Sequence, residues 1–209
     1  IAHQLAGLSS QIKQDCARFK NGNRLTVRPD RVNNCRYAIV GSDGCEIMDG
    51  SPGELHVRGP NVMLGYFRQP ELTEAVIDKD GYLNTGDIVS VNSKQEMVVQ
   101  GRTKELIIRS GFNVYPPEIE AALNTHPAVL NSAVVGRSIE CNEEIVAFVE
   151  PVPGCHIEID TLFALLDEQL ARYKKPQKIL VMSQLPVAPN GKKKKNDLKK
   201  YAEALPSFA

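Results

Sequence analysis

The sequence lacks the cysteine pattern of a disulfide framework or a metal site. Its cysteines are scattered singly and odd in number: Cys16, Cys35, Cys45, Cys141 and Cys155. None belongs to a CxxC pair, and no histidine lies at metal-ligand spacing from them. These absences argue against a disulfide-rich secreted scaffold and a zinc module, and they favour reduced thiols in the cytoplasm. We therefore expect no metal ligands in this chain.

The sequence also lacks net charge and long apolar runs. Its 25 Lys and Arg balance 25 Asp and Glu, and the pI is near 7.1. This balance argues against a protein whose main work is binding nucleic acid or an anionic membrane. No apolar run is long enough to span a bilayer, and the first residues show no signal-peptide pattern. We expect no nucleic-acid partner, no transmembrane segment and a cytoplasmic location.

What is present is enough apolar material for one or two globular domains, since 42% of the residues are hydrophobic and 24% are charged. Residues 1–34 give no clear prediction. From Asn34 to Val91, clusters of Gly, Pro, Asp and Ser separate short strand-like segments such as CRYAIVG and GELHVRG. This pattern predicts the β-rich edge of a larger domain. The missing initiator methionine also suggests that the chain belongs to something longer.

The second half predicts a compact α+β module. Two strand-like segments, EMVVQG and ELIIRSG, flank a charged turn at Gly101–Lys104, which is either a β-hairpin tip or a crossing between domains. Pro116 and Pro117 favour a helix that starts there, because proline suits the first turn. The segments LNSAVVGRS, EIVAFVEPV and KILVMS are predicted strands, and DTLFALLDEQLARY is a predicted helix.

Four blocks resemble the adenylate-forming superfamily, which includes acyl-CoA synthetases, and they occur in that family's order. They are GELHVRGPNVMLGYFRQPELTEAVI, GYLNTGD, GRTKELIIRSGFNVYPPEIE and LPVAPNGK. The resemblance covers roughly Asn34 to Lys200. It implies an α+β fold, with residues 1–103 ending the large adenylation domain and 104–209 forming a small mobile lid with a β-hairpin and a three-stranded sheet packed by helices.

The resemblance implies a nucleotide-binding role for Asp87 and Arg102. In the family, the aspartate of the TGD block receives the two ribose hydroxyls of ATP. An ionised carboxylate suits this role because its two oxygens can each accept a hydrogen bond from a vicinal diol. Arg102 corresponds to the arginine that reaches the same nucleotide, and its charged fork can hold a phosphate or ribose oxygen. Taken alone, Asp87 is a turn aspartate and Arg102 a solvated arginine.

The resemblance places the hinge at Lys104. A hinge needs an exposed residue whose backbone angles can change without breaking a packed contact. Ser110, Gly111 and Phe112 match the loop that lines the thiol tunnel in the second half-reaction, where glycine permits close approach of a ligand. The alternatives are a solvated turn at Lys104 and a glycine that merely ends a strand.

The resemblance makes Lys192 of LPVAPNGK the catalytic lysine of the first half-reaction. A positive charge delivered on a loop lowers the repulsion between a carboxylate and the α-phosphate that it attacks. The following residues Lys193, Lys194 and Lys195 depart from the family pattern. A run of this kind is usually a solvated face, and the alternative is attraction of coenzyme A phosphates.

The implied function belongs to a parent enzyme that uses ATP to convert a carboxylic acid to an acyl-adenylate and then forms the coenzyme A thioester. We expect a fatty acid as substrate, Mg²⁺ bound outside this chain, and the N-terminal domain of the same parent as partner. That domain's phosphate loop is missing here, so we expect the chain alone to be inactive. The alternatives are an adenylation domain that loads a carrier protein, a non-catalytic interaction module and a polyanion binder.

Overall fold

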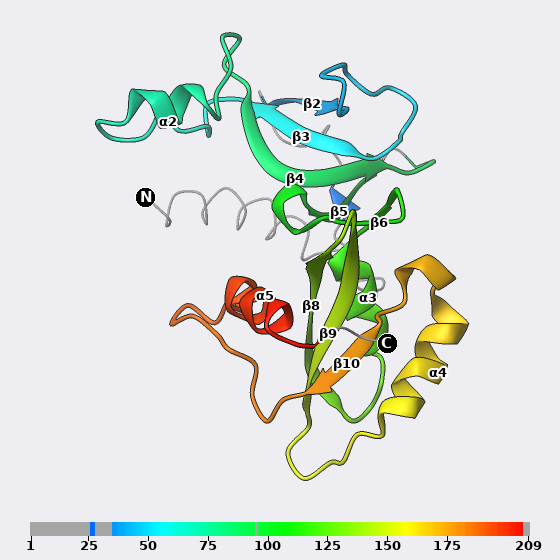
Figure 1. Cartoon of the computed structure of the whole chain (residues 1–209). Helices are drawn as coiled ribbons and strands as arrows, with labels where there is room; N and C mark the ends of the chain where they lie inside the picture. Colours follow the sequence, from blue (N-terminus) through cyan, green and yellow to red (C-terminus); the bar gives the residue numbers. More distant parts are fainter. Residues whose placement is uncertain (1–25, 28–34, 95, 207–209) are drawn as a thin grey trace. The chain divides into compact units, whose positions relative to one another are not determined.

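The computed structural model describes residues 26–27, 35–94 and 96–206. It divides between Lys104 and Glu105 into two compact units, the first unit before this point and the second unit after it (Figure 1). The four cysteines that the structure describes are all free thiols: Cys35, Cys45, Cys141 and Cys155. Cys16 lies outside the described residues.

In the first unit, the described strands form one antiparallel sheet in the order β1-β5-β4-β3-β2. The strands are β1 (Thr26–Val27), β2 (Arg36–Val40), β3 (Gly53–Arg58), β4 (Leu83–Val91) and β5 (Met97–Arg102). Ile39, Leu55, Val89 and Met97 form the buried cluster of this sheet. The predicted strands at CRYAIVG and GELHVRG are thus confirmed as β2 and β3, while β4 was not predicted.

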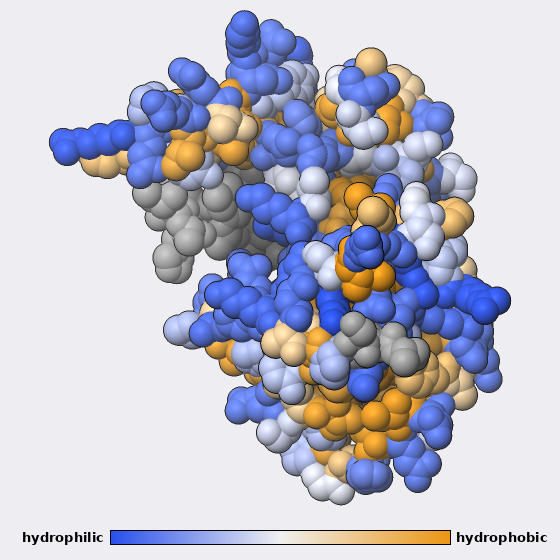
Figure 2. Space-filling view, viewed as in Figure 1, coloured by the Kyte–Doolittle hydropathy of each residue, from blue (hydrophilic) through white to orange (hydrophobic). Residues whose placement is uncertain are grey.

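Helix α2 (Pro70–Glu74) lies outside the core of the first unit and has no buried residue. Thr73 holds its start, because its hydroxyl accepts a hydrogen bond from Tyr66 N and donates one to Gln69 O. Figure 2 shows apolar side chains among hydrophilic ones over this region, where Leu64, Phe67 and Leu72 are exposed. The structure therefore leaves apolar surface open around α2.

The charged turn at Gly101–Lys104 is a crossing between units, so the hairpin alternative was wrong. Strand β5 continues to Arg102 and pairs with β4 and β1, whereas β6 (Ile107–Arg109) pairs with β7 (Phe112–Val114). A short 3₁₀ helix, η2 (Thr103–Glu105), joins them. The two apolar segments do not form one hairpin because each finds its hydrogen-bond partners within its own unit.

The described part of the second unit is built on a three-stranded sheet in the order β10-β9-β8. Strand β8 (Val129–Ile139) runs antiparallel to β9 (Asn142–Pro151), and β10 (Lys178–Val181) runs parallel to β9. The connection from β9 to β10 contains α4 (Ile159–Gln169) and the 3₁₀ helix η3 (Arg172–Lys174). All three strands occur where the sequence predicted them.

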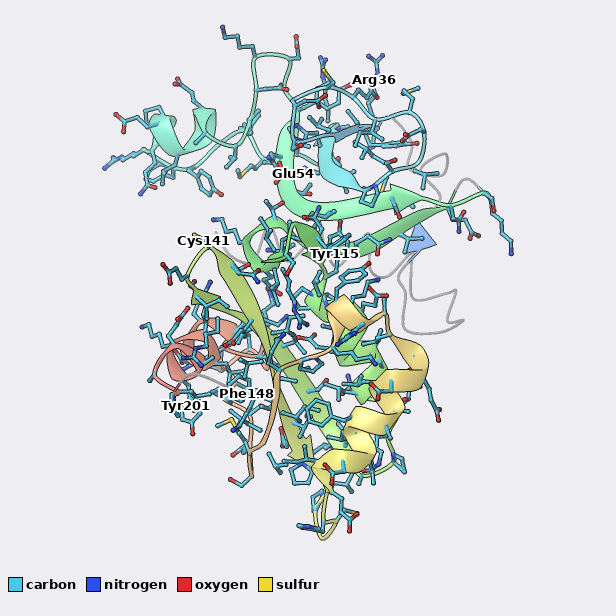
Figure 3. All side chains as sticks on the ribbon, turned by 45° about the vertical axis from the view of Figure 1, so that its right-hand side comes forward. Arg36, Glu54, Tyr115, Cys141, Phe148 and Tyr201 are labelled. Carbon is cyan, nitrogen blue, oxygen red and sulfur yellow. The ribbon has the colours of Figure 1, made fainter. Side chains whose placement is uncertain are left out.

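Helices cover both faces of this sheet (Figure 1). On one face, α3 (Pro116–Leu123) and α4 pack Ile119, Leu123, Leu162 and Leu166 against inward side chains of β8 and β9. On the other face, α5 (Lys195–Glu203) packs Leu198 and Ala202 against Val146 and Phe148. The ring of Phe148 meets that of Tyr201 on α5 edge-on at 5.9 Å (Figure 3). Burial on both faces explains why β9 is continuously apolar.

The helices differ from prediction in two places. Helix α4 ends at Gln169, and Leu170 is extended with φ −125° and ψ 143°, so the predicted helix was too long at its end. Helix α5 was not predicted, because the sequence there shows mainly lysines. The predicted α+β fold, with a β-hairpin and a three-stranded sheet packed by helices, is confirmed. None of the described helices is both long and apolar enough to cross a membrane.

Candidate nucleotide and acyl-transfer site

Asp87 and Arg102 lie directly opposite each other on the paired strands β4 and β5. Arg102 Nε donates to Asp87 Oδ1 at 2.9 Å, and the two side chains are 58% and 27% exposed. The strand register therefore brings together the two residues predicted to bind the nucleotide. Arg102 neutralises the carboxylate, and its exposed part remains available to an anionic ligand.

The TGD residues form an irregular segment within β4, and hydrogen bonds of the Thr85 side chain and of the preceding Asn84 hold it. Thr85 Oγ1 donates to Leu55 O at 2.8 Å and accepts from Asp87 N at 3.1 Å. Asn84 Oδ1 accepts from Gly86 N at 2.8 Å. Gly86 has φ +67°, and no atom lies within 4 Å of where a Cβ would stand. This segment of β4 thus fixes the Asp87 backbone and leaves open space at Gly86.

Glu54 lies on β3 (Figure 3), and the sequence did not point to it. Its Oε2 accepts from Asn84 Nδ2 at 2.9 Å, and its Oε1 accepts from the Thr103 hydroxyl. One carboxylate therefore bonds both Asn84, which directly precedes the TGD residues in β4, and Thr103 at the start of η2. Only its place in the GELHVRG block, as an acidic residue inside a strand, hinted at a special role.

Lys104 is exposed and is the last residue of the first unit. It lies within η2, between Thr103, which is bonded to the first unit, and Glu105, which begins the second unit. An exposed residue at a division between compact units meets the geometric requirement for a hinge. Its role as one stays a prediction.

Ser110 and Gly111 form the two-residue turn of the β6–β7 hairpin, in which Arg109 pairs with Phe112. Both turn residues have positive φ, +50° for Ser110 and +80° for Gly111. Asn142 Oδ1 accepts from Ser110 N at 2.8 Å, which anchors the turn to the start of β9. The tight hairpin therefore needs a glycine at this position for backbone reasons alone. The same turn is exposed, so a ligand can also approach it.

Phe112 is 55% exposed and stacks on Tyr173 of η3, with ring centroids 4.7 Å apart. Arg109 Nη1 donates to Tyr173 O at 3.0 Å and to Lys175 O at 2.7 Å. The hairpin is therefore braced against the segment after α4. The thiol-loop residues predicted from sequence lie on one exposed, well-anchored turn.

Lys192 lies on the surface, at the end of a tight turn. Gly191 N donates to Ala188 O at 2.8 Å and Ala188 N donates to Lys192 O at 2.8 Å, while Gly191 has φ +76°. In the described ranges 26–27, 35–94 and 96–206, no carboxylate is ion-paired with Lys192 Nζ. The predicted catalytic lysine is therefore not enclosed in its own unit.

The four lysines of the run have different surroundings, so their interpretation as a uniform solvated face was wrong. Lys193 Nζ donates to Ser132 O at 2.5 Å, and Lys195 Nζ contacts Glu105 and Glu120. Lys192 and Lys194 are exposed. The alternation arises because Lys193 bridges to Val187 as a strand residue would. Lys193 and Lys195 are thus engaged within the second unit, which disfavours them as phosphate-binding groups.

Among the residues that the structure describes, no group of three or more His, Cys, Asp or Glu side chains is placed to hold a metal ion. We assign no residue of this chain to Mg²⁺. The first unit brings together Asp87 and Arg102, and the second carries both the Lys192 turn and the Ser110–Phe112 hairpin.

Comparison with protein families identifies part of the second unit. Residues 118–192 match the model of the AMP-binding enzyme C-terminal domain. The match ends on Lys192. It begins within α3 and includes the three-stranded sheet and α4.

Two curated relatives are CoA ligases. Indoleacetate–CoA ligase of Aromatoleum aromaticum is 37% identical over 92% of this chain and 37% of its own length. 4-Coumarate–CoA ligase 5 of Oryza sativa subsp. japonica is 41% identical over 84% of this chain and 33% of its own length. The chain therefore spans about a third of the length of the curated relatives that it matches.

A solved structure extends the likeness to three dimensions. ATP-bound MatB from Rhodopseudomonas palustris matches with a TM-score of 0.75 and 34% identity, over 82% of this chain and 34% of that one. The family model, the two ligases and this structure agree with the four sequence blocks. The chain belongs to the adenylate-forming superfamily and contains its AMP-binding C-terminal domain.

Proposed function

We propose that this chain forms the C-terminal part of an AMP-forming acid–CoA ligase. In the proposed reaction, a carboxylate attacks the α-phosphate of ATP, pyrophosphate leaves, and the acyl group of the resulting acyl-adenylate passes to the thiol of coenzyme A with release of AMP. The observation that carries the proposal is the Asp87–Arg102 pair on adjacent strands. Two relatives named as CoA ligases support it.

The nucleotide is proposed to bind through the Asp87–Arg102 pair. Asp87 accepts hydrogen bonds from the ribose hydroxyls, and the exposed part of Arg102 faces the ribose or the phosphates. Glu54 keeps the TGD segment of β4 in place through Asn84. Because Arg102 already neutralises Asp87, a polyphosphate can approach this surface without meeting an unpaired carboxylate.

Lys192 is proposed to act in adenylate formation. Its ammonium carries the positive charge needed where a carboxylate and a phosphate, both anionic, must meet, and it stabilises charge that develops on the phosphoryl oxygens. An exposed position at the end of a tight turn suits a group that must reach a nucleotide held elsewhere. Lys104 is proposed as the pivot that allows this approach.

The Ser110–Phe112 hairpin is proposed to act in thioester formation. It lies in the second unit, like Lys192, so one moving body would carry the groups for both half-reactions. We propose residues 104–209 as the lid and residues 1–103 as the end of a larger adenylation domain. The assignment of residues 1–103 to a larger domain is supported by the apolar surface around α2, which such a domain would cover. This surface consists of the exposed side chains of Leu64, Phe67 and Leu72.

The acid is proposed to be a small carboxylic acid of unspecified class. The expectation of a fatty acid has no support from the two relatives reported above, which are named for indoleacetate and coumarate. ATP and coenzyme A remain the proposed co-substrates, and Mg²⁺ is assigned to residues outside this chain. Aryl and arylalkanoic acids therefore belong in any substrate panel beside the fatty acids.

Pyrophosphate exchange tests the proposed function. We expect a full-length protein containing this chain to exchange labelled pyrophosphate into ATP with at least one acid of the panel, and to form a thioester when free coenzyme A is added. The isolated chain should do neither. An intact protein without exchange for any aryl, arylalkanoic or fatty acid would contradict the proposal, and transfer only to a carrier-protein thiol would favour the carrier-loading alternative.

Substitution of Gly111 by valine should slow thioester formation alone. At φ +80° a β-branched residue is strained by about 1–2 kcal/mol, which corresponds to roughly tenfold in rate if the turn is displaced. Adenylate formation should be unchanged. Both half-reactions are measured separately, the second from preformed acyl-adenylate.

Gly154→Val is the matched control for this substitution. Gly154 has φ +82°, and like Gly111 it has no atom within 4 Å of an added Cβ, so the backbone strain is equivalent. It follows β9 and lies away from the hairpin in sequence. Equal slowing by both substitutions would show that strain anywhere in the second unit is enough, which contradicts a specific role for the Ser110–Phe112 turn.

A further inference from the structure

Lys195 places a charged amine between two carboxylates inside the second unit. Its Nζ lies 2.6 Å from Glu105 Oε2 and 2.8 Å from Glu120 Oε1. The lysine side chain is 18% exposed, and the Glu120 side chain is 15% exposed. Such a group is too well enclosed to be a solvated surface lysine, and it is bonded to both partners at charge-assisted distances.

This amine joins three separate elements. Glu105 ends η2 directly after Lys104, Glu120 lies in α3, and Lys195 itself begins α5. Glu120 Oε1 also accepts from Val134 N in β8 at 2.8 Å. The residue that follows the proposed pivot is therefore bonded, through one ammonium, to a helix and the central sheet of the second unit.

The turn carrying Lys192 is fixed to the same point. Only Lys193 and Lys194 separate Lys192 from Lys195. Lys193 pairs with Val187 and donates from Nζ to Ser132 O, and Lys194 N donates to Pro186 O at 2.8 Å. The connection from the pivot to the catalytic amine is thus short and hydrogen-bonded along its length.

Electrostatics keep this connection in place. Burial by itself lowers the pKa of the Lys195 amine, but the charges of Glu120 and Glu105 outweigh it, so the pKa lies above its usual value. The amine is accordingly charged throughout the neutral range. Removing it would leave two neighbouring carboxylates without their shared partner, which is costly at a largely enclosed site.

We propose that Lys195 is a positioning residue for Lys192, fixing the catalytic turn to the segment that leaves the pivot at Lys104. The proposal rests on the ligase function proposed above. In the first unit, Thr103 is bonded to Glu54, and in the second, Glu105 is bonded to Lys195. Rotation is thereby confined to Lys104, and the second unit carries Lys192 with it as one body.

The first test measures hydrogen exchange in this 209-residue chain. In Lys195→Met, we expect the hydrogen-bonded amides of Ala188, Gly191 and Lys194 to exchange about tenfold faster than in the wild type, because the turn loses its anchor. Lys195→Arg should restore protection, since it keeps the charge between the two glutamates. Lys194→Met is the matched control, because Lys194 is an exposed neighbour, and it should leave protection unchanged. Unchanged protection in Lys195→Met would overturn the proposal.

The second test measures both half-reactions in the full-length protein. We expect Lys195→Met and Glu105→Gln to slow adenylate formation about ten- to a hundredfold through misplacement of Lys192, with thioester formation from preformed acyl-adenylate nearly unchanged. Glu105→Gln is included because it keeps the Lys195–Glu120 pair and so retains the fold if Lys195→Met does not. In a Lys192→Ala background, neither substitution should slow adenylation further.

The outcomes separate this proposal from the ligase proposal. Equal losses with and without Lys192, or equal losses in both half-reactions, would show a merely structural role and overturn the positioning inference. A wild-type protein that exchanges no pyrophosphate with any acid would contradict the ligase function itself. In that case hydrogen exchange still decides whether Lys195 anchors the turn. The inferred role of Lys195 in adenylate formation would be contradicted together with the ligase function.

Discussion

Lys192→Ala should slow adenylate formation by about 10²- to 10³-fold, the loss found when one group that stabilises a developing anion is removed. The reason is that the attacking carboxylate and the α-phosphate are both anionic, and the Lys192 ammonium would lower the repulsion between them. Its turn is exposed, and within the described part of the chain no carboxylate is ion-paired with this amine. The measurement is pyrophosphate exchange in the full-length protein.

The same substitution should leave thioester formation from preformed acyl-adenylate within about threefold of the wild type, because that step requires no attack by a carboxylate on phosphate. Lys194→Ala is the matched control, since it removes an exposed amine two residues away and should change neither step. If Lys192→Ala slowed both half-reactions equally, the lysine would act in binding the nucleotide and not in the first chemical step.

Asp87→Ala should impair both half-reactions, since ATP and the acyl-adenylate share the same ribose. Two hydrogen bonds to a carboxylate contribute about 1.5–3 kcal/mol each, so kcat/KM for ATP should fall by about 10²-fold or more. The loss of charge opposite Arg102 adds to the effect, because the guanidinium would then lack its partner at 2.9 Å. Steady-state kinetics with varied ATP measures the first step, and varied acyl-adenylate the second.

Asp80→Ala provides the control for Asp87→Ala. Asp80 is an exposed aspartate in the turn before β4 and carries no proposed role. It should leave both steps unchanged. A second informative substrate is 2′-deoxy-ATP, which removes one of the two hydroxyls proposed to bind Asp87. The wild type should discriminate against it, and Asp87→Ala should not; discrimination that persists in the variant would place the ribose elsewhere.

The strands of the second unit could be predicted because burial on both faces leaves short, continuous apolar runs. In β9, Ile145, Ala147 and Val149 face one core and Val146 and Phe148 face the other. Strand β4 gave no such pattern, because Asn84, Thr85 and Gly86 interrupt it. Hydrogen bonds of the Asn84 and Thr85 side chains hold this part of the strand, and no apolar periodicity marks it.

Helix α5 was missed for a related reason. Only Leu198 and Ala202, four residues apart, face the core, and the surrounding lysines hide this narrow apolar stripe. The burial of Lys195 could not be predicted either, since its partner Glu105 lies 90 positions earlier in the chain. Contacts of that range depend on the completed fold, in which α3, β8 and α5 converge.

The residues of the candidate site were predicted one by one from the family resemblance. The structure adds the residues that hold them in place. Asp87 and Arg102 were assigned separately, and the β4–β5 register pairs them. Glu54, which holds the TGD segment of β4, and Asn142, which holds the Ser110–Gly111 turn, were not predicted. Supporting residues of this kind carry no motif of their own, because their role is defined only by which distant backbone or side-chain group they reach.

In the proposed reaction, the Lys192 amine moves to a nucleotide held by the Asp87–Arg102 pair. The most direct test of this movement is amine acetylation of the full-length wild-type protein, quantified by mass spectrometry at Lys192 and Lys194 with and without ATP plus an unreactive analogue of the acid. We expect saturating ligands to protect Lys192 strongly while Lys194 reacts as before. Equal reactivity of the two lysines in the presence of saturating ligands would contradict the account.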